Sequence, residues 1–223
     1  MNDILKQNKL FLSLFLLFFL VLVGLVFTIK HGDGVLFFAD HRTEFLNNFF
    51  IFVTKMGEGG GYIFCMVILL MIGFRIIDSL AYPLLGLLVM AFSFTAKSIF
   101  AHTRPLPYFR GLKMVDELNL IEGVYVFGGP TSFPSGHTTS GFALFALLAF
   151  FTWKKPFLVV IFFITAVLIG ISRSYLVQHF LIDILAGATL GVVIALIVKY
   201  IFSKIKLSDN SWLNKRLTSQ RNF

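Results

Sequence analysis

Long runs of apolar residues dominate this sequence. Residues 10–29 contain no charged side chain, and the chain of 223 residues is 57% hydrophobic and only 13% charged. A helix of about twenty apolar residues crosses the hydrocarbon core of a bilayer, and so few polar side chains do not cover a globule in water. The sequence therefore predicts an all-α, polytopic membrane protein.

Six of the apolar runs are predicted to be transmembrane helices. For the first, a signal peptide is the alternative, but the run is too long for an h-region and no A-x-A site follows it. Six spans place both termini on one side of the membrane. The predicted spans are 10–29, 59–74, 80–100, 136–151, 156–171 and 180–201, with 59–74 lengthened by interfacial residues.

The basic residues are distributed unevenly between the predicted loops. Of the 19 Lys and Arg residues, eleven lie on the face that carries both termini, against three acids, Asp3, Asp78 and Asp209. This face is predicted to be cytoplasmic by the positive-inside rule, and the net charge of +8 is mostly a signal of topology. The eleven are Lys6, Lys9, Arg75, Lys154, Lys155, Lys199, Lys204, Lys206, Lys215, Arg216 and Arg221.

The outer face then carries the 30–58 connection, the 101–134 loop with Ser132 open to water, and the turn at 172–178. Residues 40–55 are predicted to form an interfacial helix, because Leu46, Phe49, Phe50 and Val53 share one helical face. The glycine-rich run 57–61 is expected to be a mobile turn, and it lacks the Lys-Ser/Thr ending of a P-loop. The chain has a single cysteine, Cys65, which excludes an intrachain disulfide. The sequence also lacks a basic segment interleaved with aromatic residues, so it gives no indication of nucleic-acid binding.

Three polar clusters interrupt the apolar second half of the chain. In the first, Lys97 lies near the outer end of the predicted third span and Arg104 follows seven residues later. A helix end can direct both cations at one anion, with Pro105 stopping the helix. The alternative is that Lys97 snorkels to the lipid boundary without a partner.

The second cluster, Pro134-Ser135-Gly136-His137, directly precedes an apolar run. Pro and Ser favour the start of a helix, and Gly lets an anion approach the backbone, so the N–H groups of the first turn can hold phosphate oxygens. His137 projects from the same turn. A plain N-cap with an interfacial histidine is the alternative.

The third cluster combines Arg173 with His179 and Asp183. The last two are four residues apart at the start of a predicted helix and are expected on one face. The aspartate can accept the imidazole N–H, fix its tautomer and leave the other nitrogen free to attack phosphorus, while Arg173 reaches the same anion. A satisfied His–Asp pair inside a bundle is the alternative, but it leaves the three cations unexplained.

The complete pattern K-x6-RP, PSGH and SR-x5-H-x3-D resembles the type 2 phosphatidic acid phosphatase superfamily of integral-membrane lipid phosphatases. All three motifs match in order, and the resemblance covers about residues 60–203. It implies that His179 is the nucleophile that forms a phosphohistidine, that Asp183 is its partner and that His137 is the general acid. It also implies a metal-free reaction without cofactors. The residues that it implies for phosphate binding are Lys97, Arg104, Ser135, Gly136 and Arg173.

The sequence thus predicts one membrane phosphatase domain over residues 1–223, with a motif-bearing core at 60–203 and a basic cytoplasmic tail at 204–223. The expected activity removes a phosphate from a lipid phosphate or pyrophosphate at the outer face of a bacterial cytoplasmic membrane. Undecaprenyl pyrophosphate, phosphatidylglycerol phosphate, phosphatidate and the lipid A 1-phosphate are the candidate substrates. A phosphotransferase that uses the same phosphohistidine is an alternative, and a non-catalytic lipid-phosphate binder or transporter is another, which would not need both histidines. The oligomeric state is left open.

Overall fold

The computed structural model describes residues 1–217, so Arg221, counted above among the basic residues, lies outside the described residues. The described chain is helical, and its only β-type pairing is an isolated bridge between Arg75 and Arg216. The all-α prediction is therefore confirmed for this part. The helices are α1 (Asn2–Gln7), α2 (Lys9–Thr28), α3 (Asp33–Asp40), α4 (Glu44–Lys55), α5 (Gly59–Met71), α6 (Ile76–Ser79), α7 (Ala81–Ile99), α8 (Pro105–Gly111), α9 (Gly136–Phe151), α10 (Pro156–Tyr175) and α11 (Leu181–Lys204), with short 3-10 turns at Asp116–Leu118 and Trp212–Asn214.

Four helices of the described chain are long and apolar enough to cross a membrane, namely α2, α6 with α7, α10 and α11. Helices α4 and α5 make a fifth span if they are counted as one unit bent by 71°. Helix α9 is apolar but only 16 residues long. The predicted spans all fall on helices, and the count of six stays a prediction.

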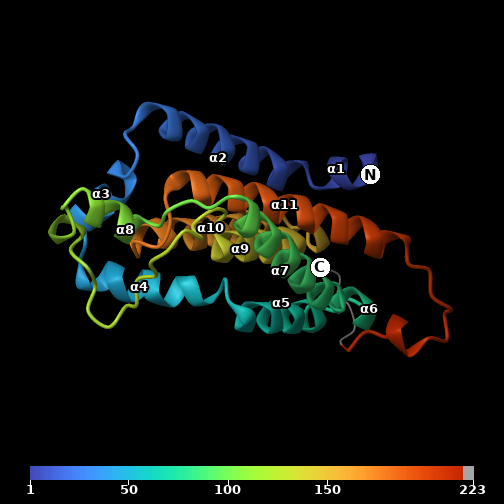
Figure 1. The fold of residues 1–223 in the computed structure, drawn as a ribbon. Helices are drawn as coiled ribbons and strands as arrows, with labels where there is room; N and C mark the ends of the chain where they lie inside the picture. Colours follow the sequence, from blue (N-terminus) through green and yellow to red (C-terminus); the bar gives the residue numbers. More distant parts are fainter. Residues whose placement is uncertain (218–223) are drawn as a thin grey trace.

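Helix α9 forms the centre of the bundle. It packs against α5, α7, α10 and α11, and every side chain from Phe142 to Phe151 is buried (Figure 1). Helix α11 approaches it closely through Gly187 and Gly191, where an added Cβ would lie 2.7 Å from the Ser135 oxygen and 2.4 Å from the Thr139 oxygen. Small residues four positions apart let two helix backbones approach in this way. The first turns of α9 and α11 are therefore held side by side.

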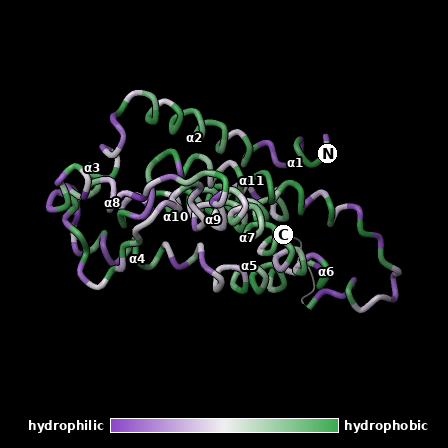
Figure 2. The backbone as a smooth tube through the Cα atoms, viewed as in Figure 1, coloured by the Kyte–Doolittle hydropathy of each residue, from purple (hydrophilic) through white to green (hydrophobic). Residues whose placement is uncertain are grey.

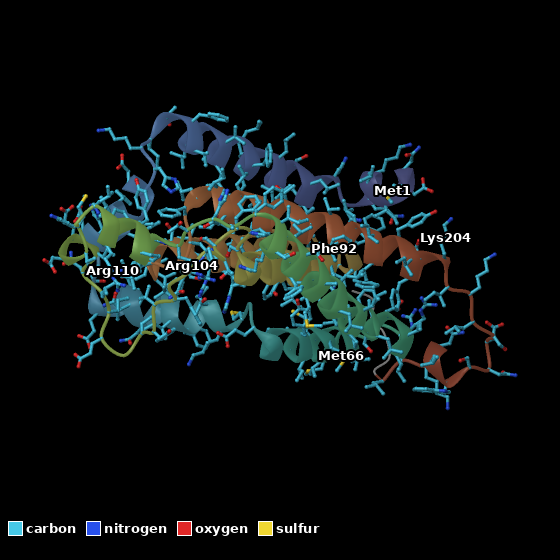
Figure 3. The ribbon with its side chains drawn as sticks, in the orientation of Figure 1. Met1, Met66, Phe92, Arg104, Arg110 and Lys204 are labelled. Atoms are coloured by element: carbon cyan, nitrogen blue, oxygen red, sulfur yellow. The ribbon has the colours of Figure 1, made fainter. Side chains whose placement is uncertain are left out.

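Hydrophilic residues gather at the two ends of the bundle, and hydrophobic residues cover the helices between them (Figure 2). Met1 and Lys204 lie at one end, whereas Arg104 and Arg110 lie toward the other (Figure 3). The chain segments that precede α2 and follow α11 are thus far from the turns that carry the three polar clusters.

The segment around residues 57–61 differs from its prediction. Gly59 and Gly61 belong to the first turn of α5 and are helical, and Glu58 is the N-cap. An added Cβ on Gly61 would lie 2.1 Å from the Met56 carbonyl oxygen, because the backbone bends sharply, by 71°, where α4 meets α5. Close backbone packing therefore explains Gly57 and Gly61, whereas an added Cβ on Gly59 or Gly60 would meet no atom within 4 Å. The predicted helix at 40–55 is present as α4, with Phe50 and Val53 buried as expected.

Candidate active site

The two cations of the first cluster converge on one carbonyl group. Lys97 Nζ donates to the Thr131 oxygen at 2.7 Å, and Arg104 Nη2 donates to the same oxygen at 3.3 Å. Arg104 Nη1 also donates to the oxygen of Gln178 at 3.2 Å, next to the predicted nucleophile. Lys97 thus has a partner inside the protein, which the snorkelling alternative does not require.

Pro105 has a different role from the predicted one. Helix α7 ends at Ile99, and Pro105 is the first residue of the next helix, α8. Proline suits this position because the first helical residue has no intrahelical acceptor for its N–H. Arg104 is therefore the N-cap of α8 in extended backbone, and its side chain is directed into the site from a turn between two helices.

The second cluster forms the predicted N-terminus of α9. Ser135 is the N-cap, and its Oγ accepts the Thr138 N–H at 3.4 Å. Its own N–H donates to the Asp183 carbonyl at 3.0 Å, which joins the first turns of α9 and α11. The N–H groups of Gly136 and His137 have no acceptor among the described residues. Such groups, at the positive end of the helix dipole, can bind an anion.

His179 and Asp183 meet, but not on one helical face. Phe180 is the N-cap of α11, so His179 precedes the helix, and Asp183 folds back from the first turn to accept the Phe180 N–H at 3.0 Å. The same oxygen, Asp183 Oδ2, lies 3.4 Å from His179 Nδ1 and accepts the Ser132 hydroxyl at 2.5 Å. Ser132 Oγ is itself 3.3 Å from Nδ1. The carboxylate therefore holds the Nδ1 proton toward itself and leaves Nε2 as the basic nitrogen.

The environment keeps His179 neutral. Its side chain is 3% exposed, and burial lowers the pKa of His179 to about 3, while the hydrogen bond to Asp183 acts in the opposite direction. Burial also lowers the pKa of Arg104, opposed by the charge of Asp183, but a guanidinium stays protonated in proteins. The site thus combines an uncharged imidazole, which has a free lone pair, with permanent positive charge.

Arg173 is nearly the last residue of α10 and is 5% exposed. Its carbonyl accepts the N–H groups of Gln178 at 2.8 Å and His179 at 3.2 Å, so the backbone fixes the two motif residues against each other. Its Nη1 donates to the hydroxyl of Thr54 on α4 at 2.5 Å. Its Nε atom is buried without a hydrogen-bond partner, as is that of Arg104.

The second histidine has a carboxylate partner that sequence reasoning missed. His137 Nε2 lies 3.3 Å from Glu58 Oε1, and their side chains are 31% and 51% exposed. His137 and Glu58 are therefore more exposed than the pair formed by His179 and Asp183.

The three cations have no counterion among the residues that the structure describes. Among residues 1–217, no carboxylate oxygen lies within 4.0 Å of Lys97, Arg104 or Arg173. Arg104 and Arg173 are buried and each has an unsatisfied Nε group, and Lys97 is partly buried. Cations in such surroundings, with only neutral partners, attract an anion. No group of three or more His, Cys, Asp and Glu residues with metal-ligand geometry forms in the described chain.

This arrangement agrees with the comparison with known families, in which the model of the PAP2 superfamily matches residues 78–207. The chain belongs to the PAP2 superfamily. The predicted resemblance is thereby confirmed, and the matched range includes all three motifs.

Individual relatives of this PAP2 protein agree with the assignment. A segment of 83 residues is 41% identical to phosphatidylglycerophosphatase B of Bacillus subtilis (strain 168), and it covers 34% of this chain and 41% of that protein. The aligned part thus spans less than half of the relative's length. The structure of Aquifex aeolicus LpxE has the same fold, with a TM-score of 0.62 and 24% identity over 78% of this chain and 97% of that one. The transmembrane PAP2-type phosphatidylglycerolphosphate phosphatase of Bacillus subtilis gives a TM-score of 0.53 and 25% identity over 88% and 97%.

Ser132, Thr54 and Glu58 contact residues of the candidate site but were not predicted to belong to it. Ser132, expected in water, is fully buried. Thr54 is a polar residue on the apolar face of α4, and Glu58 is the one acid in a glycine-rich run. Those two departures from the local pattern were available signals. The hydrogen bonds themselves link segments 51 to 119 residues apart, and the sequence does not reveal them.

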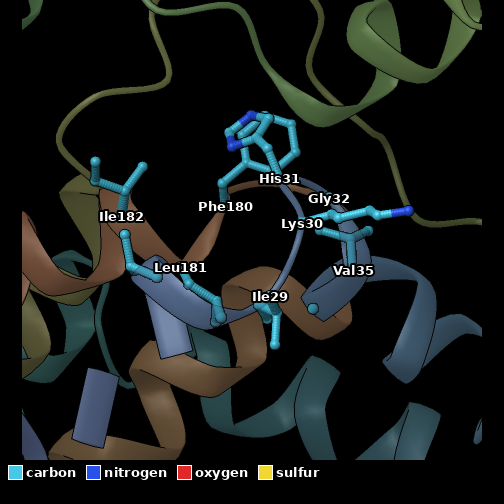
Figure 4. A pocket seen from close by; sticks show the side chains of 10 residues that line it. Ile29, Lys30, His31, Gly32, Val35, Phe180, Leu181 and Ile182 are labelled. Atoms are coloured by element: carbon cyan, nitrogen blue, oxygen red, sulfur yellow. The ribbon is translucent and has the colours of Figure 1, made fainter. Parts of the chain in front are cut away.

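A small cavity of about 90 Å³ lies beside the start of α11 (Figure 4). Lys30 and His31, from the turn between α2 and α3, line it together with Phe180 and Leu181. The His31 ring packs on Phe180 with centroids 4.0 Å apart. Burial lowers the pKa of His31, and the charge of Asp183 opposes this effect. The turn after α2 therefore packs on Phe180, the residue that follows His179.

Proposed function

We propose that this chain is a lipid phosphatase that cleaves a phosphate monoester or pyrophosphate through a phosphohistidine at His179. The single observation that carries the proposal is that three cations, which have no counterion among residues 1–217, gather around a neutral histidine whose Nδ1 faces Asp183. A phosphate dianion supplies the charge and the acceptor oxygens that this site lacks. The membership of the PAP2 superfamily supports the same reaction class.

In the proposed first step, the Nε2 lone pair of His179 attacks phosphorus and a P–N bond forms while the bond to the leaving oxygen breaks. His137 gives a proton to that oxygen, and the developing negative charge is stabilised by Lys97, Arg104, Arg173 and the N–H groups of Gly136 and His137. In the second step, water loses a proton to His137 and attacks phosphorus, and the P–N bond breaks. Inorganic phosphate and the starting enzyme result. These charges and hydrogen-bond donors all come from the protein, so the proposal includes no metal or cofactor.

Phosphatidylglycerol phosphate is the first substrate to test, because the curated relative with 41% identity is named phosphatidylglycerophosphatase B. Undecaprenyl pyrophosphate, phosphatidate and the lipid A 1-phosphate are the other candidates. All four join a charged phosphate to a lipid tail, which suits a polar site at the end of an apolar bundle.

We further propose that the site lies on the outer face of a bacterial cytoplasmic membrane and that both termini are cytoplasmic, within one domain whose residues from 204 onward form a basic tail. The distribution of basic residues supports this orientation. Cysteine labelling in intact cells tests it, with the buried Cys65 first replaced by Ala. Glu122→Cys should react with an impermeant maleimide and Ser208→Cys only after lysis, and the reverse would overturn the orientation.

The reaction is tested by phosphate release from the four lipids, with purified wild type and His179→Ala. We expect His179→Ala to lose activity by about four orders of magnitude or more and Asp183→Asn to keep a small residual rate, because it only misorients the ring. His41→Ala is the control, since His41 is exposed and hydrogen-bonds to its own helix. Substantial turnover by His179→Ala would refute the mechanism. Tight lipid binding without phosphate release by the wild type would indicate a binder, and transfer to an added acceptor lipid would indicate a phosphotransferase.

A further inference from the structure

The bend between α4 and α5 brings Glu58 to His137. The two helices meet at 71°, and Glu58 lies in the short connection between them. Its Oε1 atom is 3.3 Å from His137 Nε2, on an imidazole that extends from the first turn of α9. This contact joins residues 79 positions apart, and Glu58 lies outside all three motifs and outside the range 78–207 that matches the family.

The backbone around Glu58 is fixed against α9. An added Cβ on Gly57 would lie 2.9 Å from the His137 carbonyl oxygen and 2.9 Å from Ile169 Cγ2, so the connection packs directly on the turn that carries the histidine. Glu58 is the N-cap of α5, but its carboxylate makes no capping hydrogen bond to that helix. Its carbonyl accepts the Gly61 N–H at 2.9 Å, and its side chain is directed to His137.

His137 lies between positively charged residues and one carboxylate. Arg173 and Arg104 act on it from the phosphate-binding side, and Glu58 is the carboxylate that faces it. Asp183 is the corresponding carboxylate for His179. Each histidine of the site therefore has its own acidic partner, one buried and one about half exposed.

We propose that Glu58 is the positioning residue for the general acid, an inference that rests on the proposed function of His137. The carboxylate accepts the proton on Nε2, fixes the ring plane and stabilises the imidazolium against the nearby arginines. The protonated ring then gives the proton on its other nitrogen to the leaving oxygen as the bond to phosphorus breaks. Neutral His137, still hydrogen-bonded to Glu58, is ready to accept a proton from water in the second step.

The test compares two leaving groups. An alkoxide such as the diacylglycerol of a short-chain phosphatidate needs a proton as it departs, whereas p-nitrophenolate departs without one. Since general acid catalysis contributes about 10²–10⁴-fold, we expect Glu58→Gln to lower kcat/KM about tenfold or more on phosphatidate and by less than about twofold on p-nitrophenyl phosphate. The ratio kcat/KM is compared because it reports the steps up to formation of the phosphohistidine and excludes its hydrolysis, which is common to both substrates. Glu44→Gln, an exposed carboxylate at the start of α4, is the matched control and should change neither rate. Equal losses on both substrates would overturn the proposal for Glu58.

A double-mutant cycle separates this proposal from the function on which it rests. His137→Ala should show the same dependence on the leaving group, to a larger extent, and Glu58→Gln should add no further loss in the His137→Ala background. If His137→Ala lowers kcat/KM equally for both substrates, the general acid role of His137 fails. If His137→Ala discriminates between the substrates but Glu58→Gln does not, or if the two losses multiply, the Glu58 proposal fails and the proposed function stands.

Discussion

Two arginine-containing clusters lie at opposite ends of the helical bundle, and they differ in the partners of their cations. At the α6 end, Arg75 Nη2 and Nε donate to the two oxygens of Asp78 at 2.8 and 3.0 Å. The Arg75 N–H also donates to Asp78. We call this the paired cluster. At the other end, Lys97, Arg104 and Arg173 donate to carbonyl and hydroxyl oxygens and to no carboxylate within residues 1–217. We call these three residues the unpaired cluster.

The difference shows how the same side chain can serve structure or function. The forked contact with Asp78 neutralises Arg75 and caps α6, and the neighbouring backbone bond from Ile76 to Lys215 ties the segment after α11 to this end. Neutral partners hold Arg104 and Arg173 in place but leave their charge and their Nε groups available. Arginines that are held in place by neutral hydrogen-bond acceptors keep their positive charge uncompensated, and such arginines can bind an anion.

The largest contrast is expected for activity. Arg104→Ala and Arg173→Ala should each lower kcat/KM by about 10²–10³-fold, which is typical for the loss of one donor to a developing oxyanion. Arg75→Ala should leave the rate per folded molecule within about twofold and lower the melting temperature instead, because it leaves Asp78 buried without its cation. Phosphate release and thermal unfolding of the three variants measure both effects. A loss of activity in Arg75→Ala as large as in the others would refute the distinction.

Vanadate sharpens the same contrast, because it adopts the trigonal-bipyramidal geometry of the transferred phosphoryl group. It should inhibit competitively, and Arg104→Ala should raise its inhibition constant by a larger factor than the substrate KM. Arg75→Ala should change neither constant. Equal factors for vanadate and substrate would mean that Arg104 provides only uniform binding.

Substitution of Ser132, near the unpaired cluster, is expected to have a smaller effect on activity. Its hydroxyl donates to Asp183 Oδ2 and lies 3.3 Å from His179 Nδ1, so Ser132→Ala should misorient the ring and lower kcat about tenfold with little change in KM. The matched variant is Ser79→Ala, next to Asp78 of the paired cluster, which removes a hydroxyl that donates to the Ile76 carbonyl. Its kcat should equal that of the wild type. A larger effect from Ser79→Ala would contradict the assignment of Ser132.

The smallest expected effect is on how the melting temperature depends on pH. The unfolded pKa of histidine is about 6.5, and burial lowers the pKa of His179 to about 3. The unfolded chain therefore binds more protons between these values, so the stabilisation is complete above pH 6.5 and is lost as pH falls toward 3. Arg75, whose pKa is raised by its hydrogen bond to Asp78, stays charged throughout. The melting temperature of the wild type should fall more steeply from pH 6.5 to 4 than that of His179→Asn, and equal slopes would contradict a neutral His179.

The sequence indicated much of the site around the unpaired cluster because these residues lie in short motifs at helix ends. Ser135 was expected as an N-cap and is one, and the partnership of His179 with Asp183 was expected and is present. The reason given for that partnership was wrong in detail, because His179 precedes α11 and the contact arises from a folded-back side chain. Residue spacing predicted the proximity but not the backbone conformation.

The remaining residues depend on packing between distant segments. Thr54 and Glu58 reach Arg173 and His137 only because α4 and α5 meet at a sharp bend against α9. Hydropathy likewise placed the helices but not their exact ends, so Pro105 was read as a stop and is the start of α8. The close approach of α9 and α11 at Gly187 and Gly191 is a tertiary property too, although the spacing of the glycines is visible in the sequence.

The central claim is that the unpaired cluster holds a phosphate for attack by His179, and trapping the intermediate tests it most directly. Wild type, His179→Ala and Arg75→Ala would each be mixed with phosphatidylglycerol phosphate labelled with 32P in its terminal phosphate. The reaction would be quenched with alkali within milliseconds and the protein analysed by peptide mass spectrometry. We predict an acid-labile, alkali-stable phosphoryl group on His179, absent from His179→Ala and formed at the wild-type level in Arg75→Ala. A label on any other residue, or full turnover without a label on His179, would contradict the account.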